Sequence, residues 1–188
     1  IFFLSSYLIT AGIISPIVPL GDNILRIAAK VGAVSATPVR SYVFPGATHT
    51  RYLHSIGVMN VSTLVFDFLF KEQNKDILRL RETLRLGCLL HDIGHAPLSH
   101  STESVMPMVQ ELKLPKRFEI KKNRQATHED YTIKSITDSS FTESFKSVKA
   151  QFGIDPNAIA ELVIGASIIL IRKILDKNAA AHKGIWQK

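Results

Sequence analysis

The chain has 188 residues, of which 46% are hydrophobic and 21% charged, and its formal net charge is +7. These values exclude a disordered chain and allow one domain with a substantial core. The positive charge favours polyanionic partners, namely nucleotides, nucleic acid or a phosphate-rich surface, without choosing among them. The single cysteine, Cys88, excludes an internal disulfide and predicts a reducing, cytoplasmic compartment.

The first stretch of the chain, Ile1 to Leu20, is strongly apolar and uncharged. It has no basic flank, and Gly12, Pro16 and Pro19 interrupt it, unlike a signal or membrane segment. We therefore expect buried strands or short helices there and no membrane partner. Because the sequence lacks an initiator methionine, we expect residues 1–188 to form a single domain that is part of a longer chain.

A first long helix is predicted after the turn at Pro45-Gly46. It should begin near Thr48 or Thr50 and run to about Phe70. Helix-like spacing gives it one mostly apolar side, formed by Leu53, Gly57, Asn60, Val61, Leu64, Val65 and Phe68.

A second helix is predicted from about Lys75 to Ile93, before Gly94 and Pro97 end or bend it. Its apolar residues recur at three- and four-residue steps: Ile77, Leu80, Leu84, Leu86, Cys88, Leu89 and Leu90. The stripe widens toward the C-terminal half, which should be nearly surrounded by protein. Cys88 is accordingly expected to be a core thiol and not a nucleophile.

Two further helix starts are marked by capping residues. Thr127 can serve as N-cap, with Asp130 in the third position of an arrangement like a capping box. Asp155 and Pro156 are typical of a cap and a first helical position, and that helix is expected to run past Leu170. The sequence therefore predicts an all-α fold.

Polar groups continue the buried stripe of the second helix. One helical step beyond Cys88 leads to His91 and Asp92, and a further turn leads to His95. Burying imidazoles and a carboxylate is costly unless they are paired or bind a metal. His91 and His95 are four residues apart and would share a helix face. The pattern predicts a metal site, and hydrogen-bonded core histidines that cap a helix end are the alternative.

The first helix offers two residues to this site. His54 is the natural third ligand, and Arg51 lies one turn before it on the same face. Imidazole and carboxylate ligands together suit Mn, Fe, Zn, Ni or Co better than Ca. The planar guanidinium of Arg51 suits phosphate oxygens, while a surface or ion-paired arginine is the alternative.

Three motifs resemble those of the HD-domain metal-dependent phosphohydrolases. Residues 44–58, FPGATHTRYLHSIGV, resemble the first motif and are closest to the branch that contains deoxynucleoside triphosphate triphosphohydrolases. Residues 89–100, LLHDIGHAPLSH, resemble the second motif, and residues 127–129, THE, resemble the third. The motif core is thus 44–130. The resemblance implies an all-α HD-type helical bundle with a metal site between helices, and often a homo-oligomer.

The resemblance also implies roles for individual residues. The metal ligands would be His54, His91 and Asp92. The residues that handle protons or hold the attacked phosphate would be His95 and His128, with Glu103 orienting a histidine or water. The residues that contact phosphate would be Arg51 and His100. In that branch, water attacks the α-phosphorus of a deoxynucleoside triphosphate, which leaves deoxynucleoside and triphosphate; a bound metal lowers the pKa of that water.

One part of the family pattern is absent. The pattern ends with a further aspartate ligand in a run resembling Asp-x-Asp-Arg-x-Asp-Tyr, which this sequence lacks. Asp130, Asp138 and Asp155 come too early, and the neighbours of Asp176 do not match. We hypothesise that an internal segment after Val163 is omitted from the sequence.

A catalytically inactive HD domain that binds nucleic acid or a protein partner is the alternative function. The missing aspartate and the positive charge favour it, whereas the intact Arg51, His95 and His128 favour an enzyme. A basic loop over residues 113–124 is also open to two interpretations. It is either a solvated loop or a segment that reaches over the site and attracts polyphosphate.

Overall fold

The computed structural model describes residues 50–71, 74–96, 98–118 and 123–165. Within these ranges the chain is helical, and its one β-feature is an isolated bridge between Met108 and Gln125. The α-helices are α3 (Arg51–Leu69), α4 (Lys75–Leu90), α5 (His128–Thr137), α6 (Glu143–Phe152) and α7 (Pro156–Val163). The short 3-10 helices are η2 (Ser99–Val105), η3 (Val109–Leu112) and η4 (Lys116–Phe118). The all-α prediction is confirmed.

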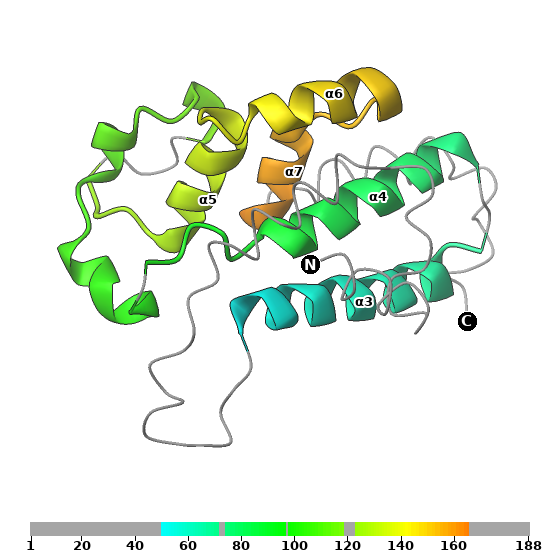
Figure 1. The fold of residues 1–188 in the computed structure, drawn as a ribbon, viewed down its shortest axis with the longest axis horizontal. Helices are drawn as coiled ribbons and strands as arrows, with labels where there is room; N and C mark the ends of the chain where they lie inside the picture. Colours follow the sequence, from blue (N-terminus) through cyan, green and yellow to red (C-terminus); the bar gives the residue numbers. More distant parts are fainter. Residues whose placement is uncertain (1–49, 72–73, 97, 119–122, 166–188) are drawn as a thin grey trace.

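Helices α3 and α4 lie side by side, and α4 also packs against α7, which in turn packs against α5 (Figure 1). Side chains cap both long helices at their first turns. The hydroxyl of Thr50 accepts from the N–H of Leu53 at 3.2 Å, and the side chain of Asn74 accepts from the N–H of Ile77 at 3.0 Å. Each cap satisfies an N–H group that the helix itself leaves unpaired. The predicted start of the first helix at Thr50 is confirmed.

The side of α3 that the sequence spacing marks as apolar is exposed. Val61 is 60% exposed, Leu64 63% and Phe68 72%. The buried side consists of Ser55, Ile56, Met59, Thr63 and Phe66. Because α3 is apolar almost all round, spacing alone does not determine its inward side, and packing against α4 does. By length and composition alone α3 would also suffice to cross a membrane, so the absence of a membrane partner stays a prediction.

Helix α4 ends at Leu90, three residues before the predicted end at Ile93. The next residues form a turn in which the N–H of His95 donates to the carbonyl of Asp92 at 3.2 Å. A close tertiary approach explains the early end. A Cβ atom built on Gly94 would lie 2.2 Å from the carbonyl oxygen of His128, so the turn fits directly against the first turn of α5. The predicted apolar stripe is otherwise buried at Ile77, Leu80, Leu86, Leu89 and Leu90.

The core lies between the inner sides of the five helices and the segment that joins α4 to α5. Its most buried large side chains include Leu90, Ile133, Ile136, Phe145 and Ile159. Cys88 packs against this cluster as a free, half-buried thiol, and burial raises its pKa. A protonated buried thiol is a poor nucleophile, which agrees with the core role expected from the sequence.

The predicted caps of the later helices are present. The carboxylate of Asp130 accepts from the N–H of Thr127 at 2.8 Å, and Asp155 accepts from the N–H of Asn157 at 3.0 Å, with Pro156 as the first residue of α7. The expectation that this last helix runs past Leu170 is wrong, because α7 ends at Val163. The chain turns away there, and Gly165 has a φ of 67°.

One helix was not predicted from the sequence, and two predicted features lie outside the described residues. Helix α6 (Glu143–Phe152) has no counterpart among the helices predicted from the sequence. The apolar stretch of residues 1–20, and Asp176 near the C-terminus, lie outside the described residues. The proposed single domain over residues 1–188 therefore stays a prediction.

Candidate metal centre and histidine cluster

The three predicted metal ligands lie together at the junction of α3 and the turn after α4. Nε2 of His54 is 3.8 Å from one carboxylate oxygen of Asp92, and Nε2 of His91 is 3.2 Å from the other. One ligand atom from each residue lies within 4.8 Å of the other two. The structure therefore brings together the three residues that the sequence predicts as metal ligands, although they come from two distant segments of the chain.

Backbone geometry fixes how His91 faces this centre. Its Nδ1–H donates to the carbonyl oxygen of Cys88 at 2.8 Å, which is one of the carbonyls left unpaired at the end of α4. The same hydrogen bond leaves the Nε2 lone pair free on the side of Asp92, the arrangement found around metal-bound histidines. Two imidazoles and one carboxylate suit a divalent transition metal, so His54, His91 and Asp92 form a candidate metal centre.

Arg51 lies at the edge of this centre. Its NH1 donates to Asp92 at 3.2 Å, and its NH2 donates to the hydroxyl of Ser99 at 2.6 Å. Ser99 has a φ of 59°, a left-handed conformation that is uncommon for residues with a side chain. The guanidinium is thus held between α3 and the start of η2, and its 32% exposed side chain leaves donors for an anion.

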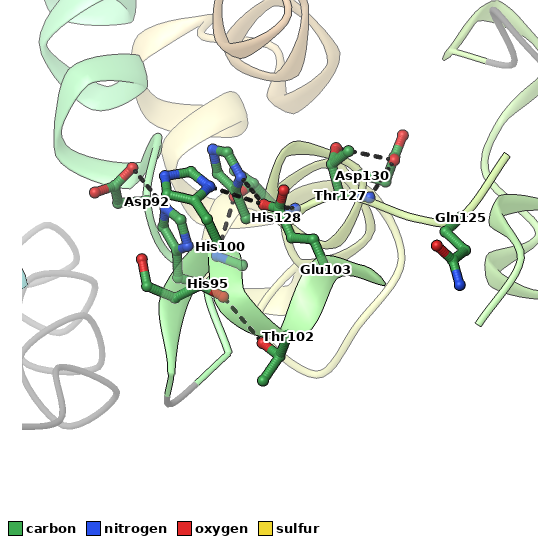
Figure 2. Close-up of polar contacts among 12 residues, drawn as sticks. Asp92, His95, His100, Thr102, Glu103, Gln125, Thr127, His128 and Asp130 are labelled. Carbon is green, nitrogen blue, oxygen red and sulfur yellow. Dashed lines mark hydrogen bonds and ion pairs between the residues drawn. The ribbon is translucent and has the colours of Figure 1, made fainter. Parts of the chain in front are cut away.

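Three imidazoles and one carboxylate form a second group beside the centre, which we call the histidine cluster: His95, His100, Glu103 and His128. Figure 2 shows the three rings close together, with Glu103 on one side of them and Asp92 on the other. The rings of His95 and His128 are stacked, with centroids 3.9 Å apart and planes inclined by 5°. The ring of His100 meets both edge-on, at centroid distances of 4.7 Å and 4.9 Å.

Glu103 organises two of these rings. Its Oε1 accepts from Nδ1–H of His128 at 2.6 Å and from Nδ1–H of His100 at 3.1 Å. The hydrogen bond from His128 is the largest of the influences that lower the pKa of Glu103 to about 2. Glu103 is therefore a carboxylate at neutral pH, and both rings keep Nε2 available for another molecule.

His95 connects the two groups. Its side chain is 3% exposed, and its Nε2 lies 3.6 Å from the Asp92 oxygen that faces His91. Burial, and next the neighbouring His128, lower the pKa of His95 to about 4, so the ring is neutral near pH 7. Among the described residues, its buried Nδ1 finds no hydrogen-bond partner.

The expectation that His91 and His95 share a helix face is wrong. Because α4 ends at Leu90, both residues belong to the turn and the segment after it, and they enter different groups. His91 joins the metal centre and His95 joins the histidine cluster, with Asp92 between them. The sequence predicts one site for both histidines, and the structure has two adjoining groups instead.

Aspartates outside the centre have other partners. Asp130 pairs with Arg124 through two hydrogen bonds of 2.5 Å and 2.8 Å, Asp138 pairs with Lys134, and Asp155 caps α7. These contacts agree with the expectation that these aspartates are not the family's fourth ligand. The pair with Asp130 also fixes Arg124 at one end of the basic loop, whose Lys121 and Lys122 lie outside the described residues.

Sequence patterns missed three residues that shape the site. Ser99 binds Arg51, Gly94 permits the close approach of α5, and Thr132 hydrogen-bonds to both sides of the turn that carries the ligands. Gly94, two residues after the His-Asp pair, is the one available signal, and from sequence alone it indicates only the end of a helix. The roles of Ser99 and Thr132 depend on a backbone angle and on a contact between helices, which a single sequence does not display.

Comparison with protein families decides which fold family this site belongs to. The HD domain family matches residues 51–165, a range that includes every member of the metal centre and of the histidine cluster. The chain belongs to the HD domain family. HD domains are in general metal-dependent hydrolases.

Curated relatives match parts of this HD domain. The chain is 38% identical over 98 residues to "Deoxynucleoside triphosphate triphosphohydrolase SAMHD1 homolog" of Dictyostelium discoideum, covering 51% of the chain and 17% of the relative. It is 30% identical over 131 residues to the human deoxynucleoside triphosphate triphosphohydrolase SAMHD1, covering 66% and 19%. It is 31% identical over 128 residues to an uncharacterized protein of Mycoplasma pneumoniae, covering 66% and 26%. The chain thus spans about a quarter or less of each of these relatives.

Proposed function

We propose that this HD domain belongs to a metal-dependent phosphohydrolase that converts deoxynucleoside triphosphates and water into deoxynucleosides and triphosphate. The observation that carries the proposal is the contact between the metal centre and the histidine cluster through Asp92, which lies 3.2 Å from His91 and 3.6 Å from His95. A metal-binding group and a proton-handling group side by side are what hydrolysis of a phosphate bond requires. The activity for which two of the relatives are named supports the choice of nucleotide.

His54, His91 and Asp92 would hold the metal, whose identity among Mn, Fe, Zn, Ni and Co is left open. A bound divalent metal would lower the pKa of a water molecule and neutralise charge on a phosphate oxygen. The protein must then orient the metal ligands. His91 is held by Cys88, and the carboxylate of Asp92 is held by Arg51, so both are oriented before any substrate arrives.

Arg51 and His100 would bind the polyphosphate. Both lie at the open side of the site, with Arg51 32% and His100 67% exposed. Ser99 and Asp92 already hold the Arg51 side chain in place. Arg51 would therefore lose little side-chain entropy when it binds phosphate. A guanidinium can offer two parallel N–H donors to one phosphate group, an arrangement that fixes the direction of the bond to be broken.

His128 would transfer the proton of the reaction, and Glu103 would hold it in one tautomer. Because Nδ1–H of His128 donates to Glu103, the Nε2 atom is the one that can accept or release a proton. The neutral, buried His95 stacked on that ring would exclude water from one of its faces. The pairing of a histidine with an orienting carboxylate is a common arrangement for general acid–base catalysis.

Turnover with product identification tests this proposal. The wild-type chain, supplied with Mn²⁺ and a mixed pool of deoxynucleoside triphosphates, should release deoxynucleosides and triphosphate in a chromatogram. Asp92→Ala should release neither. Asp76→Ala is the matched control, because Asp76 is an exposed aspartate of α4 whose side chain pairs with Arg79.

Two results would redirect the assignment. Release of deoxynucleoside diphosphates or monophosphates would still show a phosphohydrolase but would exclude the triphosphohydrolase reaction. No turnover by the wild type, together with salt-sensitive binding of nucleic acid, would favour the inactive, nucleic-acid-binding HD domain instead.

The proposal also covers the cellular location and the assembly of the protein. The free thiol of Cys88 supports a reducing, cytoplasmic location. The exposed apolar side of α3 would be covered in a homo-oligomer or by the rest of a longer chain. Sedimentation of the full-length protein would distinguish a single copy from an assembly.

A further inference from the structure

A buried threonine joins the turn that carries the metal ligands to the helix that carries His128. Thr132 is 0% exposed and lies four residues after His128 on α5. Residues four apart share a helix face, so Thr132 and His128 point toward the same part of the molecule. Thr132 contacts the turn from His91 to Gly94, and the ring of His128 stacks on His95, the next residue after that turn.

Both hydrogen-bonding functions of the Thr132 hydroxyl are used on this turn. The hydroxyl donates to the carbonyl oxygen of His91 at 3.0 Å and accepts from the N–H of Gly94 at 3.0 Å. The first of these groups is left unpaired where α4 ends, and the second belongs to the turn itself. The two bonds therefore span the turn from its first residue to its last.

The absence of a side chain on Gly94 makes this contact possible. A Cβ atom there would lie 2.3 Å from the N atom of Thr132 and 2.8 Å from its hydroxyl oxygen. The backbone of the turn thus rests directly on the first turn of α5. Consequently, the position of α5 sets the distance between His128 and the ligands His91 and Asp92.

We propose that Thr132 is a positioning residue: its hydroxyl locks the His91–Gly94 turn to α5 and thereby holds the metal ligands and His128 in register. The proposal rests on the metal-dependent function proposed above. It adds that His91 is held at two points, its ring by Cys88 and its backbone carbonyl by Thr132. Loss of the Thr132 hydroxyl should release the backbone carbonyl of His91 without replacing any metal ligand.

Two substitutions separate the hydroxyl from the shape of the side chain. Thr132→Val keeps the branched shape and removes the hydroxyl, whereas Thr132→Ser keeps the hydroxyl and removes a methyl group. Thr137→Val is the matched control on the same helix. The hydroxyl of Thr137 donates to the carbonyl of Ile133 within α5 and makes no bond to the turn.

Binding of Co²⁺ to the full chain, followed by its visible absorption, measures the ligand geometry without any turnover. Partners beyond the ligands typically contribute about 10- to 100-fold to metal affinity, so Thr132→Val should weaken Co²⁺ binding by about 10-fold or more and alter the spectrum. Thr132→Ser and Thr137→Val should bind like the wild type. Thermal unfolding of each metal-free variant shows separately what the substitution does to stability.

Wild-type Co²⁺ affinity and spectrum in Thr132→Val would overturn the proposal, even if the melting temperature falls. If Thr132→Val does not fold, hydrogen exchange of the unaltered protein tests the same bond. Slow exchange of the Gly94 amide would support the proposal, and exchange at the rate of an exposed amide would overturn it. Because Co²⁺ binding is read without substrate, a wild type that binds Co²⁺ but hydrolyses no nucleotide would refute the proposed function alone.

Discussion

Oε1 of Glu103 lies 2.6 Å from Nδ1 of His128, a residue 25 positions further along the chain. The same oxygen also accepts from the backbone N–H of His128 at 3.4 Å. Glu103 therefore fixes both the ring of His128 and the first turn of α5. In the neutral ring this contact places the proton on Nδ1 and leaves the Nε2 lone pair for the substrate side.

Glu103→Gln should make the stability of the protein less dependent on pH in acid. The folded-state pKa of Glu103 is lowered from 4.5 to about 2, so its charged form favours folding. That contribution is present above about pH 4.5 and is lost as the pH falls toward 2. Urea unfolding at several pH values should show the advantage of the wild type over Glu103→Gln shrinking below about pH 4.5.

Glu129→Gln is the control for this measurement, because Glu129 is an exposed carboxylate next to His128 in the first turn of α5. The stability difference between Glu129→Gln and the wild type should change less with pH than the difference between Glu103→Gln and the wild type. An advantage of the wild type over Glu103→Gln that stays constant from neutral pH down to about pH 3 would show that the Glu103 carboxylate is not stabilised by His128.

Ser99→Ala and Ser99→Gly should separate the hydroxyl from the backbone conformation. Both variants remove one of the two side chains that hold Arg51 and leave Asp92 as the other. A lost hydrogen bond to a charged group corresponds to about tenfold or more in affinity, so KM should rise by about tenfold in both. Only glycine adopts the φ of 59° without strain, so Ser99→Gly should be about 1 kcal/mol more stable than Ser99→Ala. Steady-state kinetics and urea unfolding check the two expectations. An unchanged KM in both variants would exclude the role of Ser99 in holding Arg51.

Gly94→Ala and Gly57→Ala should have opposite effects on stability. The new methyl group at Gly94 would meet backbone atoms of α5 at 2.2 Å and 2.3 Å, so α5 must shift, and we expect a loss of about 1–3 kcal/mol. At Gly57, within α3, nothing lies within 4 Å, and alanine should stabilise the helix by about 0.5–1 kcal/mol. Chemical denaturation measures both changes. Equal effects at the two positions would contradict the close packing of the turn on α5.

Local signals in the sequence predicted the helix starts and pointed to the residues that the structure groups at the candidate metal centre. Capping at Thr50 and Asp155 depends on neighbouring residues only, and a His-Asp pair at the end of an apolar stripe is itself a local pattern. Burial of uncompensated imidazoles is unfavourable in any fold, which is why the pattern predicted a metal site at His91 and Asp92.

Tertiary contacts decided the features that the sequence did not predict. The inward side of α3 is chosen by α4, because apolar residues surround the helix and Phe68 is exposed while Phe66 is buried. The end of α4 is set by the approach of α5 to Gly94. The separation of His91 from His95 follows from that early end, since continued helical spacing would have kept them on one face.

The location of the bound metal is the most direct test of the site. Crystals of the wild-type chain grown with Zn²⁺ should show an anomalous scattering peak bound by Nε2 of His54, Nε2 of His91 and an oxygen of Asp92, at about 2.0–2.2 Å from each. In Asp92→Ala that peak should be absent. A peak held by His100, Glu103 and His128, or no peak in the wild type, would contradict a metal centre at the junction of α3 and the turn after α4.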